Sequence, residues 1–401
     1  MLGKTIALYR NAYSGLAPST WLLSLVMLVN RSGTMVIPFM TIYLTRPSMG
    51  YSIGEAGMVM GIFGLGAVCG GFIGGRLTDK FGFYRVQLIT LTGGGFLFFL
   101  LGQMKSLPLI CAVTFALSLV NEAFRPANST AIAHFSKEEN RTRSYSLNRL
   151  AINLGWSAGA TLGGILASIN YHLLFWVDGA TNIAAAILLR SLLSGDSNHR
   201  STFKKEITSK PSVLSAYQDK KYLLFIVLTT LFAMCFFLLF TVLPVFYKQE
   251  LLLPEYFIGL LMGLNGLTCV IFEMILVFKM EGRRDNLFYI SRGVLGVSLS
   301  YLLLNILPAS AAAAVFCMLV VTLGEIFTMP FLNSFWVTRT VSSNRGQYAG
   351  LYTIAWSIAQ VIGPAGGSQI AEHFGFRTLW WAAGGLCIVT AIGFRRMQLI
   401  K

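Results

Sequence analysis

Apolar residues occur in this sequence in runs that are too long for the core helices of a soluble protein. The run from Trp21 to Leu44, WLLSLVMLVNRSGTMVIPFMTIYL, contains a single charged residue. A helix needs about 20 predominantly apolar residues to cross the hydrocarbon core of a bilayer. Lipid offers the backbone no hydrogen-bond partners, so only helices or closed barrels can span it, and these runs are far longer than barrel strands. We therefore expect an all-α membrane protein.

The composition argues against a soluble nucleic-acid-binding protein despite the basic charge. Charged residues make up 12% of the chain and hydrophobic residues 55%, whereas soluble domains carry roughly 25% charged residues. The net charge of +15 resides in short loops between the apolar runs. The six cysteines lie inside apolar runs without metal-ligand spacing, which favours small buried side chains over a metal site. We expect no nucleic-acid partner and no bound metal.

Hydropathy predicts twelve transmembrane helices, which we number as spans in chain order. They are expected at 19–44, 52–76, 85–104, 107–134, 144–169, 172–194, 222–247, 254–279, 287–307, 310–336, 347–371 and 376–395.

Lysine and arginine are distributed unequally between the two sides that these spans define. Cytoplasmic loops of membrane proteins carry an excess of these residues. We therefore expect both termini in the cytoplasm and a multi-pass location in a bacterial inner membrane. Of the 31 lysines and arginines, four lie on the opposite side: Arg46, Lys105, Lys248 and Arg377. Three fall inside spans: Arg31, Arg125 and Arg149. All the others are on the cytoplasmic side.

The two halves of the chain resemble each other in sequence. Between them, the polar segment 195–221 separates six spans from six. Parallel repeats of six helices, related by an axis along the membrane normal, produce two pseudo-symmetric bundles. We expect an N-terminal bundle over 1–194, a cytoplasmic linker over 195–221 and a C-terminal bundle over 222–401. Three pairs of segments match at nearly one spacing: Tyr145–Gly164 with Tyr348–Gly367, Met60–Leu65 with Met262–Leu267, and the surroundings of Glu122 with those of Glu325.

The loop between spans 2 and 3 has the sequence GRLTDKFGFYR. It resembles the cytoplasmic signature of the major facilitator superfamily, G-x-L-a-D-R/K-x-G-R/K-x. The match covers Gly75, Asp79, Lys80 and Gly82; it departs at Phe83, where the family usually has a base that Arg85 can supply. The resemblance implies a conformational latch made by Gly75, Asp79, Lys80, Gly82 and Arg85. Gly75 would allow close helix approach, Gly82 a tight turn, and Asp79 a charge–dipole contact.

Span 5 resembles the antiporter motif of the same family, G-x3-G-P-x2-G-G, with Ala160 in place of the proline. Its glycines Gly155, Gly159, Gly163 and Gly164 are also what close helix packing in a membrane needs. Both interpretations stay open from the sequence. The fold-level resemblance covers the whole chain and implies a monomeric secondary transporter that works by alternating access, with its substrate site between the halves. The sequence has no catalytic triad, metal cluster or nucleotide-binding loop, so we expect that the protein is not an enzyme and needs no cofactor. We expect the proton gradient to drive transport.

Ionisable residues inside the spans are the candidates for function, because each costs roughly 2.5–3.5 kcal/mol at the bilayer centre. Arg31 lies in the middle of span 1. Glu122 and Arg125 are three apart in span 4 and share one helix face, so an Arg31–Glu122–Arg125 cluster is expected; a static helix-holding pair is the alternative. Glu325 has no base in its own span and is the expected proton carrier. Asp178 is placed near the outer end of span 6, where it could be interfacial.

The expected proton-coupling residues are Glu325, Glu122 and Arg125. The expected substrate-binding residues are Asn30, Arg31, Glu122, Asn153, Trp156, Phe240, Glu325, Asn333, Trp356 and Gln360. A cavity of aromatic residues with few charges suits amphipathic compounds. The sequence therefore predicts proton-coupled efflux of small amphipathic or drug-like molecules. The alternative is uptake of an organic anion held by Arg31 and Arg125.

Overall fold

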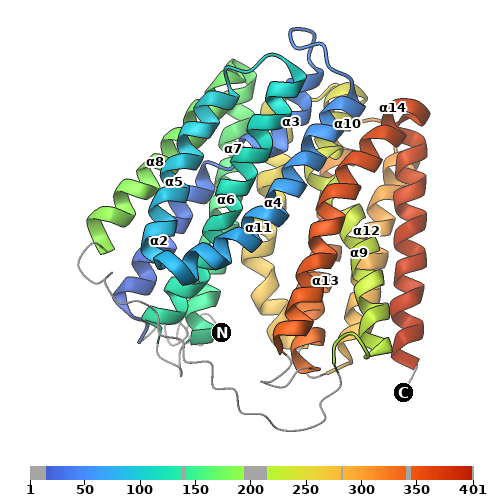
Figure 1. The fold of residues 1–401 in the computed structure, drawn as a ribbon. Coiled ribbons are helices and arrows are strands. Elements are labelled where there is room, and N and C mark those ends of the chain that lie inside the picture. The colour runs from blue at the N-terminus through green and yellow to red at the C-terminus, as the bar shows by residue number, and fades with distance from the viewer. Residues whose placement is uncertain (1–14, 137–140, 194–214, 281–282, 340–344, 400–401) are drawn as a thin grey trace, which may run out of the picture. The chain divides into compact units, whose positions relative to one another are not determined.

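The structure is a computed structural model that describes residues 15–136, 141–193, 215–280, 283–339 and 345–399 (Figure 1). All regular secondary structure in these ranges is helical. The helices are α2 (Pro18–Ser32), α3 (Val36–Thr45), α4 (Ile53–Phe81), α5 (Phe83–Leu101), α6 (Leu107–Phe135), α7 (Arg141–Ile169), α8 (His172–Leu193), α9 (Lys220–Thr241), α10 (Leu243–Gln249), α11 (Glu255–Met280), α12 (Asn286–Ile306), α13 (Ala311–Thr338) and α14 (Arg345–Leu399).

Within the described ranges, 11 helical stretches are long and apolar enough to cross a membrane, with α2 and α3 counted as one. The last stretch, α14, is divided at Gly375, whose φ of 80° and ψ of 160° are not helical. Each of its two parts exceeds the length of about 20 residues that a span requires. The division at Gly375 therefore yields the twelfth span, and the predicted all-α membrane fold is confirmed.

Two spans that the sequence predicts as continuous helices are broken. Span 1 is interrupted between α2 and α3 at Gly33, Thr34 and Met35, where the Thr34 amide donates to the Arg31 carbonyl at 3.0 Å. Span 7 is divided into α9 and α10 at Val242, two residues before Pro244. Helices α4 and α13 also extend beyond their predicted ends, to Phe81 and Thr338. Hydropathy detects the part of a helix in hydrocarbon, so polar final turns escape it.

The helices group into two compact units. The first consists of residues 1–36 and 66–203, and the second of residues 37–65 and 204–401. The sequence predicts that residues 37–65 belong to the N-terminal bundle, whereas the contacts group them with the second unit. The division into two bundles at the linker stays a prediction. Most of that linker, 194–214, lies outside the described residues.

The first unit is held together by an apolar core and by close approaches of helices at glycine. Leu23, Met27 and Phe124 of α2 and α6 are among its buried side chains. A Cβ atom added to Gly66 of α4 would lie only 2.6 Å from the Phe115 carbonyl oxygen of α6. Gly70 and Gly74 contact α6 one and two turns further on, as small residues spaced by four do in membrane helices.

The second unit is built around α9, α12, α13 and α14, which pack against one another (Figure 1). Its centre holds large aromatic side chains that are fully buried. The Tyr301 and Trp380 rings stack with centroids 5.4 Å apart. The Tyr301 hydroxyl donates to the Cys235 carbonyl at 2.7 Å, which satisfies a polar group that could not be left unpaired there.

Candidate functional site

The first unit brings together the three charged residues that the sequence predicts as a cluster. Glu122 Oε2 and Arg125 Nε lie 3.0 Å apart on α6. Arg31, in the last turn of α2, lies within electrostatic range of both. The Arg125 side chain is 68% exposed, whereas that of Glu122 is 12% exposed. The carboxylate is therefore the shielded member of the pair, and the guanidinium is the exposed one.

Arg31 is the more enclosed of the two arginines. Its Nε is buried and has no hydrogen-bond partner among the residues that the structure describes. A buried donor without a partner costs about 1–3 kcal/mol. Arg31 therefore has a donor to offer to a ligand, a water molecule or a rearranged Glu122.

A buried polar chain beside Arg31 was not predicted from the sequence. Asn30 Nδ2 donates to Asn182 Oδ1 at 2.9 Å, and Asn182 Nδ2 donates to the Asp178 carbonyl at 2.8 Å. The Asp178 carboxylate accepts from the Met35 amide at 3.0 Å and from the Val36 amide at 2.9 Å. Asp178 was expected near the outer end of span 6; it lies in the second turn of α8, and its side chain is fully buried, with an exposure of 0%.

The Asp178 carboxylate therefore caps the start of α3 at the break in span 1. Amides at a helix N-terminus lack partners within the helix and favour a negative charge. Gly33 lets α8 come close, because a Cβ atom there would overlap the Thr181 hydroxyl. The available signal was the polar group Asp178, Thr181 and Asn182, which shares one face of an otherwise apolar span.

The glycines of span 5 pack directly on the segment that carries Arg31. A Cβ atom on Gly155 would lie 2.7 Å from Arg31 Cβ, and one on Gly159 would lie 2.9 Å from the Ser32 carbonyl oxygen. Asn153 and Trp156 lie on either side of Gly155 on α7 and are partly buried. The packing interpretation of this motif thus has a direct structural basis, and a role in antiport stays a prediction.

The second unit holds Glu325 in the middle of α13. Asn265 of α11 donates from Nδ2 to Glu325 Oε2 at 3.0 Å and to the Thr322 hydroxyl at 2.9 Å. Asn265 is 3% exposed. This residue was not among the predicted site residues, although its polarity in the middle of span 8 was a signal for it.

Aromatic residues of the second unit form a cluster on α9 and α14. The Trp356 ring lies 5.9 Å from both Phe236 and Phe237, centroid to centroid. Phe240 contacts Phe236 at 5.2 Å. Of the predicted lining residues, Phe240 and Trp356 therefore belong to one aromatic surface.

Two further predicted residues lie next to this surface. The Trp336 and Tyr352 rings connect Asn333 to Trp356, with centroids 5.9 Å apart between Trp336 and Tyr352 and 6.2 Å apart between Tyr352 and Trp356, and Gln360 follows Trp356 by one turn of α14. Asn333 is exposed, and its side chain meets Trp336 one turn along α13 at 3.4 Å. Gln360 lies where α14 meets α4, because a Cβ atom on Gly64 would be 2.9 Å from the Gln360 carbonyl oxygen.

The signature loop connects α4 to α5. Gly82 adopts a φ of 83°, which favours glycine, and it makes the tight turn that was expected. The close helix approach occurs at Gly74, against Ala123, whereas no described atom lies within 4 Å of a Cβ built on Gly75. Asp79, Lys80 and Arg85 are exposed, and the latch that they were expected to form stays a prediction.

A polar cluster at the start of α9 was also missed from the sequence. Asp219 caps α9 by accepting from the Tyr222 amide at 3.0 Å, and it pairs with Arg339 at 2.7 Å. The Tyr348 hydroxyl donates to the same carboxylate at 2.9 Å. Burial opposes ionisation of Asp219, but the hydrogen bonds from Arg339, Tyr222 and Tyr348 outweigh it and lower the pKa of the carboxyl. The cluster joins α9, α13 and α14.

Ionisable side chains inside a bundle of membrane-spanning helices are typical of polytopic membrane transport proteins. Residues 20–364 match the sequence profile of the Major Facilitator Superfamily. The chain therefore belongs to the Major Facilitator Superfamily, and it is a transporter rather than an enzyme.

Known proteins similar to this chain include bacterial transporters. A Na(+), Li(+), K(+)/H(+) antiporter of Planococcus maritimus is 24% identical, over 90% of this chain and 91% of its own. The quinolone resistance protein NorA of Staphylococcus aureus is 21% identical, over 82% of this chain and 84% of its own. A crystal structure of the nucleoside transporter NupG matches with a TM-score of 0.74 at 15% identity, over 96% of this chain and 100% of NupG. The last likeness concerns the fold alone.

Proposed function

We propose that the chain is a proton-coupled antiporter that exports small amphipathic or drug-like molecules by alternating access. The observation that carries the proposal is the Glu325 carboxylate in the middle of α13, which accepts from Asn265 Nδ2 at 3.0 Å. An ionisable group at this depth is costly and is retained where it has a function. The neutral amide of Asn265 can donate to a carboxylate and, through its oxygen, accept from a carboxylic acid. Glu325 can therefore gain and lose a proton without losing this partner.

The Arg31–Glu122–Arg125 cluster would supply the second charge change. When Glu122 is ionised it neutralises one of the two arginines through its 3.0 Å contact with Arg125. A proton on Glu122 would release Arg125 and leave two positive charges, one of them on Arg31. Exchange of a proton for a substrate needs this kind of competition, in which each occupant weakens the binding of the other.

The drug-like substrate class is supported by the aromatic surface around Trp356 and by the relatives. Flat aromatic side chains with few charges suit amphipathic ligands. NorA is named for quinolone resistance. A tetracycline resistance protein, class D, of Salmonella ordonez is 21% identical, over 77% of each chain.

Two other cargoes fit particular observations. Uptake of an organic anion would use Arg125, whose exposed guanidinium can hold a carboxylate or phosphate in a bidentate manner. Exchange of monovalent cations for protons is favoured by the likeness to the Planococcus antiporter, and the oxygen atoms of Glu325 and Asn265 are the hard ligands that such ions prefer. Both alternatives keep Glu325 or Glu122 as the titrating group.

The test uses everted membrane vesicles with an imposed proton gradient, acidic inside. Export by antiport predicts accumulation of a fluorescent amphipathic substrate, and uptake by symport predicts none. Glu325→Gln should abolish the gradient-driven accumulation while leaving substrate binding measurable. Asp285→Asn, a loss of the same charge at an exposed helix cap, should leave both intact. Undiminished proton-driven flux in Glu325→Gln would remove the proposal, and Na⁺- or K⁺-dependent proton release without substrate would assign the cation exchange.

A further inference from the structure

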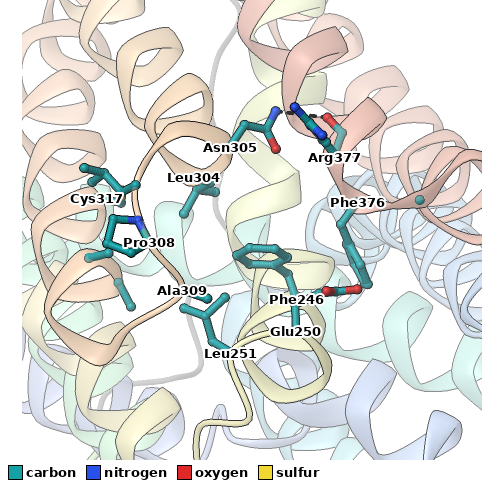
Figure 2. A pocket seen from close by; sticks show the side chains of 14 residues that line it. Phe246, Glu250, Leu251, Leu304, Asn305, Pro308, Ala309, Cys317, Phe376 and Arg377 are labelled. Atoms are coloured by element: carbon teal, nitrogen blue, oxygen red, sulfur yellow. Dashed lines mark hydrogen bonds between the residues drawn. The ribbon is translucent and has the colours of Figure 1, made fainter.

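A pocket of about 510 Å³ lies in the second unit, lined by residues from α10, the end of α12, the start of α13 and the turn at Gly375 (Figure 2). Its volume is in the range of known small-molecule sites, about 300–1,000 Å³. None of the predicted site residues lines it, and the proposed transport cycle makes no use of it.

The lining carries one positive and one negative side chain at opposite ends. Figure 2 shows Arg377 beside Asn305 on one side and Glu250 beside Leu251 on the other, with the Phe246 ring between them. Asn305 Nδ2 donates to the Arg377 carbonyl at 3.0 Å, which fixes this part of α14 to the end of α12. An arginine fork matches a phosphate, and a carboxylate accepts hydrogen bonds from an ammonium group. The arrangement fits a ligand with an anion and a cation.

Large apolar side chains point outward from the loops around this pocket. Leu252 is 80% exposed, Phe374 is 71% exposed and Ile306 is 64% exposed. These three residues lie in the connections or at the helix end beside the lining residues Leu251, Gly375 and Asn305. Exposed apolar groups next to a polar pocket are typical of a surface that contacts lipid at the membrane interface.

Leu252 is held outward at an energetic cost. Its φ of 54° lies in the left-handed region, which is unfavourable for a side chain of this size. The turn is fixed on both sides, because the Leu251 amide donates to the Phe246 carbonyl at 3.3 Å and the Leu253 amide donates to the Tyr247 carbonyl at 3.0 Å. Strain of this kind persists where the surrounding structure enforces it, and it occurs frequently at binding sites. An acyl chain would cover the exposed leucine.

We propose that this pocket binds the head group of a zwitterionic phospholipid with a primary amine, its phosphate at Arg377 and its ammonium at Glu250. The acyl chains would lie over Leu252, Phe374 and Ile306. A phosphatidylethanolamine provides both charges together with N–H donors for the Glu250 carboxylate. Phosphatidylglycerol lacks the ammonium group, so it would satisfy only the Arg377 end. The proposal requires the chain to reside in a membrane and is independent of the transported substrate.

The experiment measures thermal unfolding of the purified full-length protein in detergent with added short-chain lipids. Dihexanoyl phosphatidylethanolamine should raise the Tm by several degrees more than dihexanoyl phosphatidylglycerol at the same concentration, since a ligand of the native state stabilises it. Equal shifts with the two lipids would overturn the proposal, and this comparison needs no variant. An equal shift with phosphorylethanolamine, which has no acyl chains, would overturn the assignment to a lipid.

Variants then localise the effect. Arg377→Gln and Glu250→Gln should each abolish the excess shift caused by the ethanolamine lipid. Arg396→Gln, the same change at an exposed arginine near the other end of α14, should retain it. Retention of the excess shift in both pocket variants would overturn the assignment to this pocket.

Discussion

The Asp178 carboxylate offers a sharp test of how the break in span 1 is held. Asp178→Asn keeps the size of the side chain but leaves one oxygen for the two amides of Met35 and Val36, which now donate at 3.0 and 2.9 Å. The new NH2 group also points a donor at the Met35 amide. The substitution therefore removes the 3.0 Å hydrogen bond of the Met35 amide to a charged oxygen and leaves this buried N–H with only its 3.2 Å contact to the remaining oxygen.

The expected cost follows from these two losses. A hydrogen bond to a charged group contributes about 1.5–3 kcal/mol, and an unpaired buried donor costs about 1–3 kcal/mol. These ranges overlap in what they count, so we expect a loss of about 2–4 kcal/mol. A domain of 150–250 residues loses roughly 2–4 °C of Tm per kcal/mol. Unfolding of purified protein in detergent, followed by intrinsic fluorescence, should therefore show a Tm lower by about 4 °C or more.

Asp285 provides the matched control. It caps α12 by accepting from the Leu287 amide at 2.7 Å, but it is exposed. Asn caps a helix about as well as Asp does, so Asp285→Asn should leave the Tm nearly unchanged. Equal Tm values for the two variants would refute the reasoning, because they would show that the charge on Asp178 contributes nothing at the break.

Three further predictions concern other parts of the site. Gly159→Ala should lower the Tm and the transport rate, because its Cβ atom would lie 2.9 Å from the Ser32 carbonyl oxygen, whereas Gly366→Ala, with no described atom within 4 Å, should raise the Tm slightly or leave it unchanged. Burial raises the pKa of Asp219, but the hydrogen bonds from Arg339 and its neighbours outweigh burial, so folding lowers this pKa. The ionised Asp219 carboxylate therefore stabilises the fold above the unfolded pKa of about 3.9, and this stabilisation is lost as the pH falls through the folded pKa. The Tm difference between wild type and Asp219→Asn should accordingly be large at pH 7 and shrink below about pH 4, and a difference independent of pH would contradict the ionic role. Trp356→Ala should raise the KM for an amphipathic substrate about tenfold or more and leave any proton-driven exchange of a small inorganic cation unchanged. Flux assays in proteoliposomes measure both activities. An unaltered KM would exclude the aromatic surface from substrate binding.

Much of the fold follows from local features of the sequence. Hydropathy alone located all the stretches of the described residues that are long and apolar enough to cross a membrane, because a span needs only its own residues to satisfy its backbone. The helical spacing of Glu122 and Arg125 likewise predicted their pairing, which the structure places at 3.0 Å. Arg31 was assigned to the same cluster because a charged side chain in the middle of a span needs a polar partner or a cavity.

The features that the sequence did not predict depend on contacts between distant residues. The break in span 1 needs the carboxylate of Asp178, which is 143 residues from Met35. The position of Asn265 beside Glu325 depends on how α11 packs against α13. Gly75 was expected at the close helix contact because of its place in the signature, but the register of α4 on α6 puts Gly74 there instead. Hydropathy contains no information about register or about which helices are neighbours.

The cap supplied by Asp178 has a consequence for the synthesis of the protein. Span 1 leaves the ribosome long before α8 has been made, so the Met35 and Val36 amides cannot yet have their carboxylate partner. Unpaired amides are costly in hydrocarbon. The newly inserted span should therefore begin as an unbroken helix, in which these amides bond to carbonyls one turn earlier, and bend only when α8 arrives. The mature shape of the first span is thus acquired late, after six spans are in the membrane.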